Sequence, residues 1–194
     1  MKKAIRKSFQ DSMELLDRFI ENEENIRIIE EISSLLAETF QRGGKVMIFG
    51  NGGSTCDAMH FAEEFTGRFR KERRPLPAIA IADSSHITCV GNDYGFDDIF
   101  SRGIEAYAGK NDMVIGISTS GNSANIIKAI NKAKELGCIT FGLLGKDGGK
   151  TASLCDYQII VPGQTSDRIQ EIHMTILHII IETVERIMFP ESYN

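Results

Sequence analysis

Residues 46–54 decide the fold, and they read VMIFGNGGS. The first four residues are all apolar, which is typical of a short buried strand, and Gly50 ends the run. The adjacent Gly52 and Gly53 let the backbone approach a ligand closely, and a helical pattern follows over about 55–67. The start of such a helix offers free N–H groups to an anion. The stretch therefore predicts a strand, an anion-binding turn and a helix; a tight turn without a ligand is the alternative.

The same alternation of short apolar runs and helical segments continues along the chain. Further strand-like runs lie at 78–81, 114–117, 139–144 and 159–161. Helical patterns lie between them at about 97–108, 123–136 and 148–154, and a long one follows at about 166–188. Short buried strands that alternate with helices form parallel sheets covered on both faces. We therefore predict an α/β fold with a doubly wound, five-stranded parallel sheet of the flavodoxin-like kind.

The N-terminal part of the chain carries two further helical patterns. Apolar side chains recur at helical spacing over about 4–21 and again over 26–40, and Gly43 and Gly44 end the second pattern. The sequence contains no internal repeat, low-complexity stretch or interdomain linker. We therefore expect a single domain over 1–194, in which 1–42 form an N-terminal helical extension.

Composition and charge argue against several classes of protein. The 194 residues carry a formal net charge of −5, which argues against a nucleic-acid partner, and the basic run at 68–74 is interpreted as a solvated loop. No apolar stretch is long enough to cross a bilayer, so no membrane partner is expected. The basic N-terminus is followed by no apolar run and does not have the pattern of a secretory signal.

The four cysteines indicate a reducing compartment. None of them forms a C-x-x-C pair or a cluster with zinc-finger spacing. Cys89, Cys138 and Cys155 lie in or beside apolar runs, where buried free thiols are expected. Together with the missing secretory pattern, this predicts a cytoplasmic protein.

A loop rich in hydroxyl groups follows the third predicted strand. Residues 118–123 read STSGNS, which places four hydroxyls in six residues without a charge, and a helix follows. Hydroxyls and backbone N–H groups at a helix start bind phosphate. A triphosphate usually recruits lysine and Mg²⁺, so the loop favours a phosphomonoester; an ordinary capped helix start is the alternative. Thr55 stands where a dinucleotide fingerprint needs glycine, and no P-loop motif is present.

Acid–base or metal chemistry is indicated by His60 and Glu64. They are four residues apart, so they share one face of the helix that starts at the glycine turn. Such a pair can form a proton relay, contribute to a metal site or make a surface ion pair. Its place in this helix favours the functional readings.

The last helix carries a second polar group. Periodicity does not decide whether Gln170 or Glu171 shares a ligand with His178. His178 is flanked by apolar residues and is either functional or a satisfied core histidine. His173 points well away from His178 and is interpreted as a structural or interface residue.

These motifs together resemble the sugar isomerase (SIS) domain family, and more narrowly its bacterial phosphoheptose isomerases. The resemblance covers nearly the whole chain. Its most specific stretches are 50–54 (GNGGS), 56–64 (CDAMHFAEE), 91–93 (GND), 117–123 (ISTSGNS), 167–173 (DRIQEIH) and His178. The serine loop alone marks only an SIS domain, whereas His60 and Glu64 together with Gln170 and His178 mark the heptose enzymes.

The resemblance implies a role for each motif position. The phosphate would be held by Ser118, Thr119, Ser120 and Ser123. The sugar would be contacted by Asn51, Gly52, Gly53, Ser54, Glu64, Asn92, Asp93, Asp167 and Gln170. One zinc ion per subunit would be held by His60, Glu64, Gln170 and His178. Glu64 and His178 would also be the catalytic acid/base pair, and Arg68 matches a motif position without a defined role. The resemblance also implies a homotetramer, which would cover the apolar stripes of the N-terminal helices.

The implied reaction converts sedoheptulose 7-phosphate to D-glycero-D-manno-heptose 7-phosphate through an enediol. A base takes a carbon-bound proton and an acid supplies one near the carbonyl oxygen, which a carboxylate and an imidazole can do. A carboxylate bound to zinc is a weaker base, so both a catalytic and a structural zinc are open. Other SIS proteins are non-catalytic sugar-phosphate-binding regulators or scaffolds for a replication initiator, and they lack this Glu and His pair. Retention of Glu64 and His178 favours the enzyme.

Overall fold

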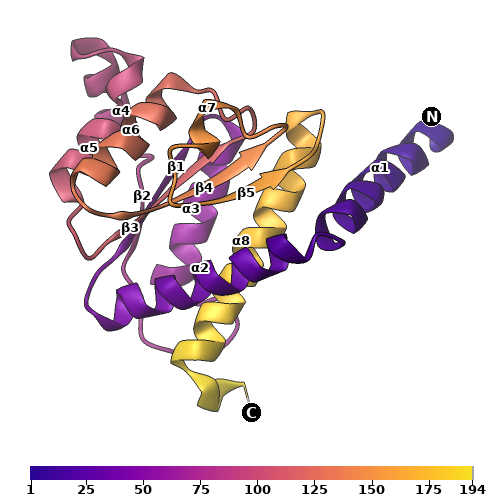
Figure 1. Ribbon diagram of the computed structural model, residues 1–194, viewed down its shortest axis with the longest axis horizontal. Coiled ribbons are helices and arrows are strands. Elements are labelled where there is room, and N and C mark those ends of the chain that lie inside the picture. The colour runs from indigo at the N-terminus through magenta and orange to yellow at the C-terminus, as the bar shows by residue number, and fades with distance from the viewer. Residues whose placement is uncertain (194) are drawn as a thin grey trace.

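The computed structural model describes residues 1–193. Five parallel strands form one sheet in the order β2-β1-β3-β4-β5, and helices cover both of its faces (Figure 1). The strands are β1 (Val46–Gly50), β2 (Ala78–Ala80), β3 (Met113–Ser118), β4 (Ile139–Gly145) and β5 (Tyr157–Val161). The predicted doubly wound, five-stranded parallel sheet is confirmed, and each strand begins and ends within two residues of its predicted bounds.

The helices follow the predicted alternation, with one addition. They are α1 (Lys2–Ile20), α2 (Glu23–Gln41), α3 (Gly53–Thr66), α4 (Ser84–Asp93), α5 (Ser101–Tyr107), α6 (Ala124–Glu135), α7 (Gly149–Ala152) and α8 (Ser166–Met188), with 3-10 turns η1 (Phe96–Asp98) and η2 (Pro190–Ser192). Helix α4 was not predicted from the sequence. Val90 is its one buried residue, so it lacks the apolar stripe that reveals a helix. Its start is fixed by Asp83, whose carboxylate accepts a hydrogen bond from the His86 backbone N at 2.8 Å.

Alternate strand residues supply two separate cores. In β1, Ile48 packs on the face covered by α2, α3 and α8, whereas Met47 and Phe49 pack on the face covered by α5 and α6. The Phe49 ring stacks on Phe100 with centroids 5.0 Å apart. Because both faces are buried, the central strands consist almost entirely of apolar residues.

The two N-terminal helices have different environments. Helix α2 buries Ile32 and Leu36 against the sheet and lies next to α8. Helix α1 extends away from the rest of the chain (Figure 1) and buries only Leu15 and Phe19. Its other apolar side chains are exposed, among them Ile5, Phe9, Met13 and Ile20. An apolar stripe therefore remains uncovered along α1.

The cysteines are free, and their environments differ from one another. Cys138 is buried and Cys155 is half-buried, and burial raises the pKa of the two thiols to about 11 and about 12. The prediction that Cys89 is buried is wrong, because it lies on the exposed side of α4, where its Sγ is 3.7 Å from Asp93 Oδ2. Within residues 1–193, no helix is long and apolar enough to span a membrane.

The order of the strands fixes where a ligand site can form. From β1 the chain runs outward to β2, then returns to the other side of β1 and continues through β3, β4 and β5. In the pairing of β1 with β3, Gly50 lies beside Ile117. The loops that follow these two strands therefore leave the sheet next to each other. Open α/β sheets bind ligands at such a switch point.

Candidate functional site

The turn after β1 is shaped by two glycines. Gly52 has a φ of +58°, which disfavours other residues, and α3 begins at the next residue. A Cβ atom at Gly53 would lie 2.7 Å from Nε2 of Gln170, so a side chain there would displace the Gln170 amide. That amide instead donates a hydrogen bond to Ser54 Oγ at 3.4 Å. The glycine turn thus brings the start of α3 against the first turns of α8.

The serine loop after β3 is held in a tight conformation. Gly121 has a φ of +62°, and a Cβ atom there would lie 1.9 Å from the Gly148 carbonyl oxygen. Thr151 Oγ1 donates to the Gly121 carbonyl at 2.7 Å, which ties the loop to α7. Ser118 Oγ accepts a hydrogen bond from the Gly121 backbone N at 3.0 Å and lies 3.5 Å from Ser123 Oγ. The hydroxyls at both ends of the loop therefore face each other at the start of α6.

A cavity of about 190 Å³ lies between the two loops. It is lined by Asn51, Ser54, Ile117, Ser118, Thr119, Ser123, Ser166 and Gln170. All eight side chains are uncharged. Three helices begin at this cavity, because Ser54 is in the first turn of α3, Ser123 precedes α6 and Ser166 opens α8. The positive ends of three helix dipoles and several hydroxyl groups make the cavity suited to an anion.

Two residues at this cavity were not singled out in the sequence. Asn125 is buried and exchanges two hydrogen bonds with Asn51, at 3.0 Å and 2.9 Å between the amide nitrogen and oxygen atoms. Ser166 Oγ lies 3.1 Å from Thr119 Oγ1. Asn125 follows the serine loop by two residues and Ser166 opens the last helix, so only their positions next to known motifs could have indicated them.

Seven predicted substrate contacts lie outside the lining of the cavity: Gly52 and Gly53 of the glycine turn, Glu64 further along α3, and Ser120, Asn92, Asp93 and Asp167. Ser120 Oγ accepts a hydrogen bond from the Asn122 backbone N at 3.2 Å. Asn92 and Asp93 are exposed at the end of α4, and Asn92 Nδ2 donates to Asp93 Oδ1 at 2.7 Å. Asp167 is exposed in the first turn of α8, and hydrogen bonds, first that from the Thr165 side chain, lower the pKa of its carboxyl.

A second cluster forms where α3 and α8 lie against each other. The His60 Nε2 and Glu64 Oε1 atoms are 3.3 Å apart, and one ligand atom from each of His60, Glu64 and His178 falls within 4.8 Å of the others. The rings of His60 and His178 meet edge to face with centroids 5.1 Å apart. The structure therefore brings together three of the four residues predicted to hold a metal, and these could form an ion site with two nitrogen ligands and one oxygen ligand.

Partial burial shapes the acid–base properties of this cluster. Burial and then the nearby His60 lower the pKa of His178, so its ring is neutral near pH 7. Phe69 covers one side of that ring, with centroids 5.8 Å apart. Asp57, one turn before His60 on α3, has a buried Oδ2 atom without a hydrogen-bond partner among the described residues, and burial raises its pKa to about 6. The cluster therefore combines the carboxylate of Glu64 with the neutral imidazole of His178.

Comparisons with known proteins agree with this geometry. The sequence model of the SIS domain matches residues 8–145. The chain belongs to the SIS domain family. The phosphoheptose isomerase of Fusobacterium nucleatum subsp. nucleatum is 66% identical over 186 residues, which cover 96% of this chain and 96% of that protein. The phosphoheptose isomerase of Escherichia fergusonii is 54% identical over 185 residues, covering 95% and 96%.

Solved structures of phosphoheptose isomerases resemble this chain over nearly its whole length. The phosphoheptose isomerase from Neisseria gonorrhoeae superposes with a TM-score of 0.89 at 34% sequence identity, covering 95% of this chain and 98% of that one. The phosphoheptose isomerase from Francisella tularensis superposes with a TM-score of 0.91 at 32% identity, covering 95% and 97%. The fold and the sequence therefore both resemble those of phosphoheptose isomerases.

The last helix, α8, separates Gln170 from Glu171, between which periodicity did not decide. Gln170 faces the glycine turn, whereas Glu171 lies outside and accepts hydrogen bonds from Arg168 and Ser12. His173 is fully buried, and its Nε2 lies 3.0 Å from the Leu144 carbonyl oxygen at the end of β4. Burial lowers the pKa of His173 to about 4. Full burial within this chain favours the structural role for His173 over the interface role, both of which the sequence left open.

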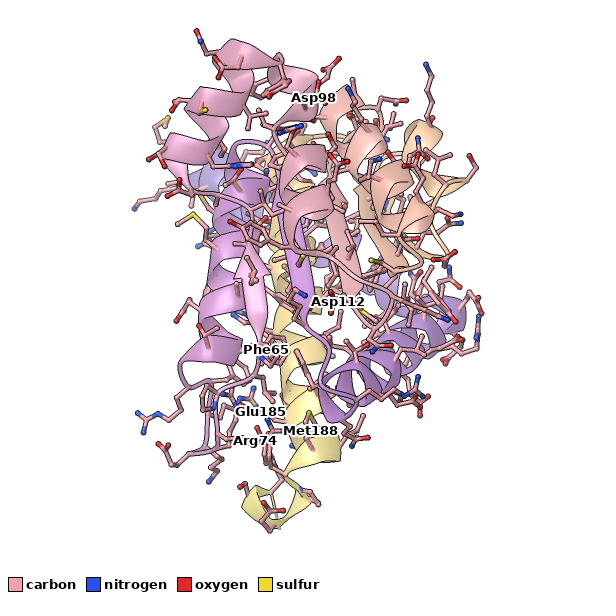
Figure 2. All side chains as sticks on the ribbon, turned by 90° about the vertical axis from the view of Figure 1, so that its left-hand side faces the viewer. Phe65, Arg74, Asp98, Asp112, Glu185 and Met188 are labelled. Carbon is pink, nitrogen blue, oxygen red and sulfur yellow. The ribbon has the colours of Figure 1, made fainter. Side chains whose placement is uncertain are left out.

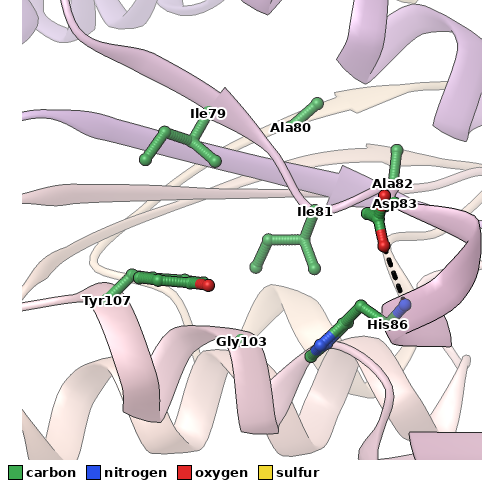
Figure 3. Close-up of a pocket in the computed structure, with 8 residues that line it drawn as sticks. All are labelled: Ile79, Ala80, Ile81, Ala82, Asp83, His86, Gly103 and Tyr107. Atoms are coloured by element: carbon green, nitrogen blue, oxygen red, sulfur yellow. Dashed lines mark hydrogen bonds between the residues drawn. The ribbon is translucent and has the colours of Figure 1, made fainter. Parts of the chain in front are cut away.

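Another cavity of the SIS domain lies beside strand β2 and is mainly apolar. Figure 3 shows Ile79 and Ile81 on the strand, with Tyr107 and Gly103 of α5 opposite them. His86 lines its end, where its ring Nε2 lies 2.9 Å from the Ile99 carbonyl oxygen. Asp83 and His86 are thus engaged in holding the chain around α4. The residues of this cavity are separate from those of the two clusters above.

Proposed function

We propose that this SIS domain is an aldose–ketose isomerase that converts sedoheptulose 7-phosphate to D-glycero-D-manno-heptose 7-phosphate. The observation that carries the proposal is the meeting of Glu64 and His178 on two helices that both begin at the uncharged, hydroxyl-lined cavity. The phosphoheptose isomerases at 66% and 54% identity support the choice of substrate.

The cavity at the serine loop is the proposed phosphate site. Ser118, Thr119 and Ser123 line it, and the amino ends of three helices point their N–H groups toward it. Charge on a phosphomonoester can be met by these dipoles and hydroxyls without a lysine. Asn51 and Ser54 would contact the sugar next to the phosphate, and the Asn51–Asn125 amide pair would hold Asn51 in place.

The sugar would extend from this cavity along α3 and α8. Gln170 and Ser54 meet at the start of the two helices, and His60, Glu64 and His178 meet further along them. A phosphate bound at one end thus directs the other end of the sugar toward the carboxylate and the imidazole. Binding energy from the phosphate then orients C1 and C2, as is common for phosphorylated substrates.

The proposed acid–base steps need only Glu64 and His178. Glu64 takes a proton from C1 of the ketose, the electrons of that C–H bond form the C1–C2 double bond, and O2 receives a proton from His178. Glu64 then returns a proton to C2, while O1 loses its proton to His178 and C1 becomes the aldehyde. One proton moves between carbons and one between oxygens, so both groups end as they began. The lowered pKa of His178 favours the neutral ring, in which one nitrogen donates and the other accepts.

The same three side chains fit a zinc ion. Two imidazoles and a carboxylate within 4.8 Å of one another provide the donor set of a zinc site with an open position. His60, Glu64 and His178 would hold the ion, with Gln170 as the fourth residue implied by the family resemblance. When bound, zinc would polarise the oxygens on C1 and C2.

We further propose that the enzyme is a homotetramer. The support is the exposed apolar stripe of α1, which includes Phe9 and Met13 at 69% and 64% exposure. A stripe of this kind on a helix that extends from the body is typical of a surface that other subunits cover.

The proposal is tested by turnover of sedoheptulose 7-phosphate, with the aldose product detected directly. We expect conversion by the wild-type protein. Binding of sedoheptulose 7-phosphate without conversion would contradict the enzyme and favour the non-catalytic sugar-phosphate-binding alternative.

A further inference from the structure

The loop that joins α3 to β2 contains one arginine that is not solvated. The basic run at 68–74 is interpreted from the sequence as a solvated loop, and Arg70 and Arg74 are indeed exposed. That interpretation is wrong for Arg73, whose side chain is 2% exposed. Its partner Glu185, on α8, is 1% exposed. A charged pair this deeply buried requires a full set of hydrogen bonds.

Arg73 joins the two helices that carry the proposed acid–base pair. Its Nε donates to Glu185 Oε1 at 2.8 Å. Its Nη2 donates to the backbone carbonyl of Glu64 at 2.6 Å, and its Nη1 donates to the carbonyls of Phe65 and Gly67 at 2.8 Å and 3.1 Å. The Glu64 and Phe65 carbonyls belong to the last turn of α3 and Gly67 is its C-cap, where carbonyls lack partners within the helix. Nη1 also donates to the Arg74 carbonyl at 3.4 Å, so the planar guanidinium binds these three carbonyls, a fourth in its own loop and one carboxylate at once.

The position of Glu185 connects this contact to His178. Glu185 follows His178 by seven residues, about two helical turns, so both lie on the same side of α8. Between them, Glu182 pairs with Arg70 at 2.7 Å. Figure 2 shows Phe65, at the end of α3, close to Glu185 on α8. Along this side of α8, His178 meets the His60–Glu64 pair, and Glu185 meets the end of the same helix through Arg73.

We propose that Arg73 is a positioning residue, which with Glu185 fixes the backbone of Glu64 relative to His178 and thereby sets the spacing of the acid–base pair. The inference rests on the proposed isomerase function. Arg73 has no role in phosphate binding, because the phosphate site lies at the opposite end of α3 and α8. Loss of the hydrogen bonds made by the Arg73 guanidinium should therefore slow the chemical step and leave substrate affinity nearly unchanged.

The main test is the variant Arg73→Lys, since lysine keeps the charge opposite Glu185 but cannot bind three carbonyls in a plane. We expect kcat to fall about 10- to 100-fold, as for a displacement of about 1 Å at a reacting group. We expect the KM for sedoheptulose 7-phosphate to stay within about 3-fold of the wild-type value. Arg73→Gln, which also removes the charge, should lower kcat at least as much if it folds.

A matched control is the Lys45–Asp112 ion pair. Asp112 is also buried, with 5% of its side chain exposed, and accepts hydrogen bonds from Lys45 Nζ at 2.6 Å and from the Gly109 backbone N at 2.8 Å. This pair ties the starts of β1 and β3 rather than the two helices that carry the site. Asp112→Asn should lower the melting temperature as Arg73→Lys does, with kcat unchanged. An equal loss of kcat in both variants would show that Arg73 acts through stability alone.

Crystal structures of the wild type and Arg73→Lys provide a measurement that does not depend on turnover. We expect the Glu64 carboxylate in the variant to lie about 1 Å from its wild-type position, measured relative to the His178 ring. The distance between the His60 and His178 ring centroids, 5.1 Å in the wild type, gives a second measure of how the two helices sit. Unchanged geometry, or wild-type kcat in Arg73→Lys, would overturn the proposal. If the wild type itself has no turnover, the proposed reaction fails, and the crystal structures still decide the role of Arg73.

Discussion

Acidification should destabilise the protein through His173, by an amount that follows from its burial. The ring is fully buried against β4, and its folded-state pKa is about 4, compared with 6.5 for an ordinary histidine. Because the folded-state pKa is depressed, the neutral ring favours folding above pH 6.5. That stability is lost as the pH falls from 6.5 toward 4. A pKa change of one corresponds to about 1.4 kcal/mol, so the full loss is about 3 kcal/mol.

The assay is urea unfolding of the wild type and of His173→Gln, at one protein concentration and at several pH values between 7 and 4. Glutamine can still donate a hydrogen bond to the Leu144 carbonyl but does not titrate. The contributions of all other titrating groups to the free energy of unfolding therefore cancel when the two proteins are compared. The free energy of unfolding of the wild type should fall relative to that of the variant by about 3 kcal/mol across this range. If the free energies of unfolding of the two proteins fall in parallel with pH, His173 does not contribute to acid destabilisation.

Further predictions concern the site and the assembly. Ser123→Ala should raise the KM for sedoheptulose 7-phosphate about 10-fold or more with a much smaller change in kcat, because a hydrogen bond to a charged group contributes about 1.5–3 kcal/mol and the phosphate is remote from C1 and C2; a collapse of kcat at unchanged KM would count against the phosphate site. Removal of zinc by a chelator should lower kcat, and added zinc should restore it, if the ion takes part in catalysis; a lower melting temperature with intact activity would instead indicate a structural ion. Light scattering should give a mass of four subunits of 21.5 kDa each, and a monomer at micromolar concentration would exclude the tetramer.

The features that the sequence predicted well are those with a strong local pattern. The apolar run of β1 followed by Gly52 and Gly53 predicted a strand, a turn and a helix, and the same alternation predicted the parallel sheet. Helix α4 was missed because Val90 is its one buried residue, and the same exposed helix explains the wrong prediction for Cys89. An exposed helix has no stripe of apolar residues, so hydrophobic periodicity does not reveal it.

The parts of the site that were missed depend on contacts between distant segments. Asn125 pairs with Asn51 across 74 residues, and no local motif indicates that pairing. Arg73 lies in a run of basic residues in which its neighbours are exposed, and its burial depends on Glu185, 112 residues away. Periodicity likewise did not decide between Gln170 and Glu171; the family resemblance implied Gln170, and in the structure Gln170 is the one that contacts the glycine turn.

The turnover number of Glu64→Gln decides whether Glu64 is the base that takes the proton from carbon. Glutamine keeps the size of the side chain and an oxygen atom but cannot take a proton from carbon. We expect a folded protein that binds sedoheptulose 7-phosphate with a KM close to that of the wild type and loses at least about 10²-fold in kcat. Turnover by Glu64→Gln near the wild-type rate would contradict the acid–base mechanism.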